Sequence, residues 1–204
     1  MKRYRLLIRN FLGVLLFLPL LGGCEKALKG EEKIVGTAVI NGQNYKESTV
    51  WAWNFDGYPS SLEFYKNNKL FYYIARLSPE NRDYPSYSIN FYISTGDFQF
   101  EINHPYIIEF YKDENINTLY WLDIIPYLSK NASEIFSNNT AGIAYAVSSV
   151  SDRRIPLKGE LILENIYPQT GVCYGSYSLT SDEAISEKLV IKGRFETMTS
   201  VNEF

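Results

Sequence analysis

The predicted fold is decided by residues 36–46, which read GTAVINGQNYK. Two strand-forming segments, 36–40 and 43–46, flank the dipeptide Asn41-Gly42. Asparagine and glycine accept the positive φ angles of a type I′ turn, the two-residue connection that joins antiparallel strands. This stretch therefore predicts a β-hairpin.

The same β pattern continues through most of the chain. In residues 87–93, YSINFYI, apolar residues alternate with Ser88 and Asn90, which is typical of a strand with one buried and one wet face. Further runs with this character are 49–55, 61–66, 69–77, 106–111, 116–123, 142–150, 159–167, 172–179 and 188–198. Since 16% of the residues are aromatic, we expect an all-β domain, an antiparallel β-sandwich or a barrel-like fold, with about ten strands.

One short helix is expected near residues 126–137. Pro126 suits the first helical position, and Leu128, Ala132, Ile135 and Phe136 recur at helical spacing. The helix is expected to close one end of the sheet or to pack on a face.

The amino terminus has the pattern of an export signal. Residues 1–10 are basic without an acid, and the apolar run 11–21 is too short for a spanning helix, which needs roughly 20 apolar residues. The following Leu21-Gly22-Gly23-Cys24 resembles the bacterial lipobox. That resemblance implies cleavage between Gly23 and Cys24, and acyl chains such as palmitate on Cys24. The alternative is an ordinary secretory signal that leaves Cys24 as a free thiol.

Three regions are thus expected: a signal peptide at 1–23, a lipidated cysteine and tether at 24–32, and a single β domain at 33–204. Two or three acyl chains give a stable anchor, because each buried CH₂ contributes about 0.8 kcal/mol. By the same resemblance, Glu25 in place of an aspartate favours the outer membrane. A periplasmic and a surface-facing orientation both stay open.

Charge restricts the partners. Removing residues 1–23 takes four basic residues from the 20 Lys plus Arg and none of the 23 Asp plus Glu, so the mature chain has a formal charge of −7. A nucleic-acid partner requires clustered Lys and Arg, and we expect none. The expected state is a monomer, and a β domain of this length buries a sufficient core without a disulfide or a metal.

No enzyme signature is found in the sequence. A serine hydrolase requires a histidine base, and zinc requires Cys and His ligands, yet the chain has one histidine, His104, and one cysteine besides Cys24, the strand residue Cys173. Five acidic residues offer a glycosidase pair at most: Glu101, Glu109, Asp113, Glu114 and Asp123. We therefore expect no catalysis, no cofactor and no metal site.

The surplus of aromatic residues suggests a binding face instead. Trp51 and Trp53 share one face of a predicted strand, and Tyr58, Tyr84 and Tyr106 lie in or beside loops, where rings stack on sugars. The alternative for the tryptophans is the core. A second set, Tyr73, Tyr92, Tyr111 and Tyr120, is expected out of phase with the core and on a partner surface.

The lipobox, the short tether, the first hairpin and the C-terminal meander together resemble small Bacteroidota lipoproteins of the domain-of-unknown-function type. The resemblance implies an envelope location and a β-sandwich or barrel, and it implies no activity. We expect a non-catalytic envelope lipoprotein that binds a glycan or a protein partner. The alternatives are a barrel that carries a small apolar ligand and a structural or adhesin subunit that pairs by strand addition.

Overall fold

The structure is a computed structural model of the whole chain. It describes residues 34–48, 61–65, 70–94, 101–111, 114–136, 142–167, 172–182 and 188–202. The chain divides into two units, Met1–Glu32 and Lys33–Phe204. The first unit lies outside the described residues, and so do the predicted signal peptide, Gly23, Cys24 and the tether. None of the helices in the described ranges has both the length and the apolar character that crossing a bilayer requires.

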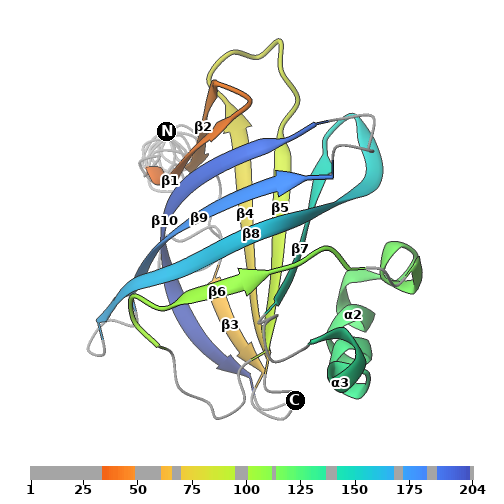
Figure 1. Cartoon of the computed structure of the whole chain (residues 1–204). Helices are drawn as coiled ribbons and strands as arrows, with labels where there is room; N and C mark the ends of the chain where they lie inside the picture. Colours follow the sequence, from red (N-terminus) through yellow and green to blue (C-terminus); the bar gives the residue numbers. More distant parts are fainter. Residues whose placement is uncertain are drawn as a thin grey trace, which may run out of the picture. The chain divides into compact units, whose positions relative to one another are not determined.

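Ten strands are described, and all belong to one mixed sheet (Figure 1). They are β1 (Ile34–Ile40), β2 (Gln43–Ser48), β3 (Ser61–Tyr65), β4 (Leu70–Pro79), β5 (Tyr87–Ser94), β6 (Pro105–Ile108), β7 (Gly142–Ser148), β8 (Ser151–Tyr167), β9 (Val172–Ser181) and β10 (Val190–Asn202). The prediction of an all-β, barrel-like domain is confirmed.

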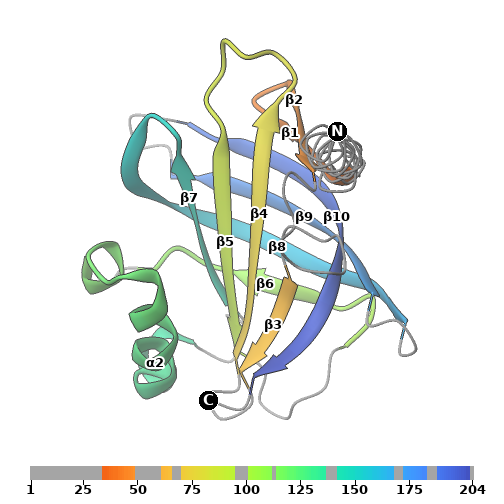
Figure 2. The ribbon, with the colours of Figure 1, turned by 180° about the vertical axis from the view of Figure 1, so that it is seen from behind.

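The sheet closes on itself. Antiparallel pairing runs through β1, β2, β4, β5, β7, β8, β9 and β10, and β10 pairs back to β1, with Ile40 opposite Ile191. The short strands lie between longer ones, β3 between β4 and β10 and β6 between β7 and β8. Figures 1 and 2 show the two crossing layers, with β8, β9 and β10 on one side and β4 and β5 on the other. Each of the ten described strands has at least two partners, so none of them is an edge strand.

The predicted hairpin is present between β1 and β2. Asn41 and Gly42 have φ angles of 50° and 82°, the left-handed values that a type I′ turn requires. The Asn41 side chain also anchors the turn to the start of β10, because its Nδ2 donates to the Lys188 carbonyl at 2.7 Å and its Oδ1 accepts from the Val190 N–H at 2.8 Å.

Aromatic rings fill the described interior of the barrel. The ring centroid of Tyr73 lies 5.6 Å from that of Phe91 and 4.5 Å from that of Phe195, and Phe91 lies 5.2 Å from Tyr177. All four residues are at most 4% exposed. Aliphatic side chains such as Ile89 and Leu157 complete this core.

Two glycines make room for these rings. In the ladder between β9 and β10, Gly175 lies opposite Phe195, and Gly193 lies opposite Tyr177. A Cβ atom on Gly175 would lie 2.5 Å from Cζ of Phe195, and one on Gly193 would collide with the Tyr177 ring. An aromatic ring over a cross-strand glycine preserves packing where a sheet curves. These two glycines are therefore required by the closure of the barrel.

A helical layer, residues 114–136, covers the outer face of β4, β5 and β7. It consists of the 3₁₀ turn η2 (Glu114–Asn117) and the helices α2 (Trp121–Lys130) and α3 (Ala132–Ile135). Beneath it the tyrosines of three adjacent strands stack, with ring centroids 4.9 Å apart for Tyr72 and Tyr92 and 6.1 Å apart for Tyr92 and Tyr145. The layer and this stack form a second apolar cluster, outside the barrel core.

Arg154 of β8 fastens the helical layer to the barrel. Its guanidinium carbon lies 4.9 Å from the ring centroid of Tyr145. The same group donates to the carbonyl of Ile116 and, at 2.6 Å, to the carbonyl of Leu119. One side chain thus contacts both the tyrosine stack and the backbone of η2 and the turn after it.

The helix predicted near residues 126–137 is present, but one predicted strand and the predicted helix start were wrong in this region. The run 116–123 is not a strand: it holds the end of η2, a turn and the start of α2. Helix α2 begins at Trp121, so Pro126 lies inside it rather than at its first position. The reason is burial, since Ile116, Ile124 and Leu128, which are all fully buried, fit the outer face of the sheet only when the chain coils.

The expected second aromatic surface was also wrong for three of its four residues. Tyr73 and Tyr92 are fully buried and Tyr111 is 9% exposed, whereas Tyr120 is 63% exposed. Tyr73 points into the barrel. Tyr92 and Tyr111 do lie out of phase with the barrel core, but the chain's own helical layer covers them. For the same reason β5 is buried on both faces over most of its length.

Candidate functional site: a groove on the outer face

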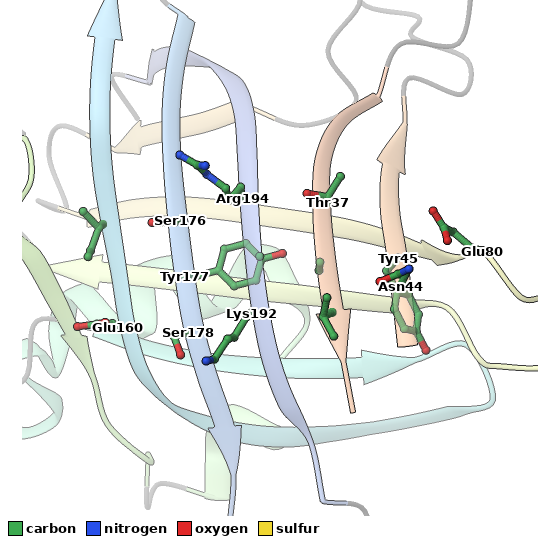
Figure 3. Close-up of a pocket in the computed structure, with 14 residues that line it drawn as sticks. Thr37, Asn44, Tyr45, Glu80, Glu160, Ser176, Tyr177, Ser178, Lys192 and Arg194 are labelled. Carbon is green, nitrogen blue, oxygen red and sulfur yellow. The ribbon is translucent and has the colours of Figure 1, made fainter. Parts of the chain in front are cut away.

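A shallow groove of about 630 Å³ crosses the outer face of β8, β9, β10, β1 and β2 (Figure 3). We call it the outer groove. Side chains alternate along a strand, and the inward residues Cys173, Tyr177 and Ile191 fill the core. The residues between them point outward and form most of the groove lining.

One row of the groove runs straight across the five strands. Glu160 lies opposite Ser178, Ser178 opposite Lys192, Lys192 opposite Val39, and Val39 opposite Asn44. Adjacent strands are about 4.8 Å apart, so the backbones of Glu160 and Lys192 are roughly 10 Å apart. Only the short side chain of Ser178 stands between them (Figure 3). The groove therefore has a hydroxyl floor between a carboxylate and an ammonium group.

The neighbouring row contains Ser176 and Arg194, which lie opposite each other. Nη2 of Arg194 lies 2.8 Å from Oε2 of Glu164. This hydrogen bond, together with one from Ser176, lowers the pKa of the Glu164 carboxyl below its usual range. Arg194 is thus held as part of the groove wall by a local pair on β8.

The far end of the groove is formed by Asn44 and Glu80. The Glu80 N–H donates to the Asn44 carbonyl at 3.0 Å, which holds the loop after β4 against β2. Both residues are exposed and line the groove. Five strands and one loop therefore supply its hydroxyl, amide, carboxylate and cationic groups.

Among the tyrosines and tryptophans predicted to bind a ligand, Trp51, Trp53 and Tyr58 lie outside the described residues. Tyr84 is 41% exposed in the loop between β4 and β5. Tyr106 is 6% exposed and belongs to the barrel core, where its ring packs edge-on to Phe71 with centroids 6.4 Å apart. Its hydroxyl accepts from the Glu101 N–H at 2.9 Å, and burial raises its pKa. The structure brings neither Tyr84 nor Tyr106 into the lining of the outer groove.

The residues considered for catalysis are also placed. Cys173 is fully buried without a disulfide, and burial raises the pKa of its thiol to about 12. His104 is exposed, with Nδ1 3.4 Å from Oε2 of Glu101. The acidic residues Glu101, Glu109, Glu114 and Asp123 are all exposed, and Asp113 lies outside the described residues. Across the described ranges, no three His, Cys, Asp or Glu side chains are grouped so that they could hold a metal ion.

The sequence of β9 contains a pattern that indicates the groove. On β9 the outward positions Ser176, Ser178 and Thr180 all carry short hydroxyl side chains, whereas the inward positions alternate with them as glycine, tyrosine and leucine. A strand whose outward face is this short leaves a depression between longer neighbours. The pattern is local, but its neighbours come from four other strands.

The chain matches no protein-family model, no curated protein and no solved structure. The fold and the outer groove therefore carry the functional argument by themselves.

Proposed function

We propose that this protein is a lipid-anchored envelope lipoprotein that binds an oligosaccharide in the outer groove and performs no catalysis. The observation that carries the binding proposal is the groove itself, about 630 Å³ in volume, where hydroxyl, amide, carboxylate and cationic side chains stand among apolar ones such as Val39 and Ile162. The anchor is proposed from the resemblance of Leu21-Gly22-Gly23-Cys24 to a lipobox, because acyl chains on Cys24 would hold the protein at a membrane surface.

The groove chemistry fits a polyhydroxyl ligand. Serine and threonine hydroxyls both donate and accept, carboxylates accept, and ammonium groups donate. Glu160 and Lys192 offer the two charged types on opposite sides of Ser178. Charge-assisted bonds to neutral hydroxyls are stronger than neutral ones. The two signs nearly balance, which favours a ligand without high charge.

The closed barrel also supports the choice of a groove ligand over the two alternatives. A carrier of a small apolar molecule would hold it inside the barrel, as lipocalin-type barrels do, but aromatic rings occupy the described interior. Strand addition needs an exposed edge strand, and every described strand already has two partners. The polar side chains of the outer face, in contrast, line a groove that is open to solvent.

The test is a glycan array followed by titration calorimetry on the best ligand. We expect Ser176→Leu and Lys192→Ala each to weaken binding by about tenfold or more. The leucine fills part of the groove, and the alanine removes the ammonium donor. Tyr84→Ala serves as the matched comparison, since Tyr84 is exposed but does not line the groove. A ligand lost with Tyr84→Ala and kept by both groove variants would move the site to the loop. Absence of any glycan ligand would overturn the proposal.

A further inference from the structure

A second hollow continues the outer groove toward β6. It has a volume of about 390 Å³, and its lining includes Ile107, Lys158 and Thr180. It shares Glu160 and Ser178 with the outer groove. The two hollows therefore meet in the middle of the β8–β9 surface.

Strand order gives the length of the combined path. The lining residues come from β6, β8, β9, β10, β1 and β2, which are neighbours in the sheet in that order. With about 4.8 Å between adjacent strands, the path from β6 to β2 is roughly 24 Å long. Both hollows are open toward solvent, and their linings join at Glu160 and Ser178.

We infer that the two hollows are one continuous groove that holds the interior of an extended sugar chain, rather than a single terminal sugar. This inference rests on the proposed function and adds the class of ligand, a linear oligosaccharide several units long. A pocket for a terminal sugar would enclose it on all but one side. Here two solvent-open hollows adjoin, so that a longer chain finds new polar partners with each added unit until both hollows are filled.

The backbone argues for a sugar chain over an extended peptide. A peptide usually gains affinity by pairing its main chain with a sheet edge. Along this path the main chains of β8, β9, β10 and β1 already pair with neighbours on both sides. The ligand must therefore be recognised by side chains, and the hydroxyls of Ser176, Ser178 and Thr180, where the path crosses β9, suit a hydroxylated ring.

Three outward residues of β9 each line a different part of the groove. Ser176 lines the outer groove alone, Thr180 the second hollow alone, and Ser178 both. Substitution of each by leucine blocks a known part of the path without changing the barrel core. Asp152→Leu is the matched control, since Asp152 is exposed on β8 and lines neither hollow. Thermal unfolding of each variant checks that the barrel is intact.

The probes are neutral linear homo-oligosaccharides of glucose, mannose and galactose, from disaccharide to hexasaccharide, titrated into the full-length protein. We expect affinity to rise with chain length, and Thr180→Leu to weaken the longest ligand by about tenfold while changing the disaccharide less than about twofold. Ser178→Leu should weaken all lengths, and Asp152→Leu none.

The outcomes separate this inference from the proposed function. Equal affinity for short and long ligands, with Ser176→Leu still abolishing binding, overturns the continuous groove and leaves the proposed function intact. Failure of all three sugar series overturns the inference of a neutral linear chain, and binding unaffected by Ser176→Leu overturns both. Binding of extended peptides that is lost in Ser176→Leu and Thr180→Leu would assign the groove to peptides and overturn the sugar chain.

Discussion

At the scale of single residues, Glu47 shows how the wall of the barrel is completed where its main chains separate. The ladder between β2 and β4 ends at Lys46 and Ser78. The next residue, Glu47, is 1% exposed. Its Oε1 accepts from the Arg76 N–H at 3.1 Å, and its Oε2 accepts from the Tyr73 hydroxyl at 3.0 Å. A buried carboxylate thus takes the place of a main-chain acceptor and also fixes a core tyrosine.

Replacing Glu47 tests this role. We expect Glu47→Ala to lower the free energy of unfolding by about 2–4 kcal/mol, because it removes the acceptor of one buried and one part-buried donor. Glu47→Gln keeps an amide oxygen at the same place and should lose less. Urea unfolding of both variants measures the difference. Equal losses in the two variants would show that the acceptor geometry is unimportant.

Cys173 provides a second prediction at this scale, through pH. Burial raises its pKa from 9.0 to about 12. The unfolded thiol therefore loses its proton first, and the stability that the buried thiol contributes is complete below pH 9 and lost between pH 9 and pH 12. The expected slope is at most about 1.4 kcal/mol per pH unit.

The measurement compares Cys173 with Cys173→Val in a Cys24→Ser background, where Cys173 is the only thiol. Because the buried tyrosines titrate in both proteins, the difference between them isolates the thiol. In the folded protein at pH 8, Cys173 should resist iodoacetamide and react only in urea. Rapid labelling of the native state, or identical pH profiles for the two proteins, would contradict the assignment.

At the scale of elements, turns and strands set by neighbouring residues could be predicted from the sequence. Which distant segment packs on the outer face of a strand could not. The first hairpin was predicted because Asn41-Gly42 carries its own turn geometry. In the predicted run 188–198, Leu189, Ile191 and Phe195 are buried, as one-sided burial of a strand requires. Tyr92 was misplaced because the helical layer that covers it comes from residues 114–136, and alternation along one strand does not report what covers its outer face.

The candidate site follows the same division. The sequence drew attention to aromatic residues, whereas the outer groove consists mainly of short and charged side chains that become neighbours only when the barrel closes. Lys192, Glu160 and Asn44, for example, share one row across the sheet but come from strands far apart in the sequence.

Arg154 is the testable link between elements. We expect Arg154→Ala to raise the hydrogen exchange of residues 114–136, since the carbonyls of Ile116 and Leu119 lose a charged donor worth about 1.5–3 kcal/mol. The exchange of β8, β9 and β10 should stay unchanged, because the barrel core does not depend on this contact. Exchange mass spectrometry reports both regions together. A uniform increase over the whole domain would mean that the helical layer is not a separate unit of stability.

At the scale of the whole molecule, the proposal combines a membrane anchor with a rigid binding surface. A closed ring of strands holds groove residues from five of them in fixed register, so little ordering is required when a ligand binds. The proposed lipid anchor would keep such a surface within reach of ligands near the membrane.

The anchor is tested in a bacterial host that processes lipoproteins. The wild-type protein should partition into the detergent phase and carry acyl chains on Cys24 by mass spectrometry, since two or more chains bind a bilayer stably. Cys24→Ser should leave the protein unprocessed and without acyl chains. Cys173→Val, the control for loss of a thiol elsewhere, should still be lipidated. An unmodified Cys24 in a water-soluble wild-type protein would refute the anchor.

The pairing of β1 with β10 has a consequence for how the molecule is made. The ribosome synthesises β1 first and β10 about 150 residues later. The pairing of β1 with β10 can therefore form only when synthesis of the domain is nearly complete. Contacts this distant in sequence form slowly. Until β10 is available, one edge of β1 therefore has unpaired backbone groups. A chain truncated before Val190 would keep this edge of β1 unpaired.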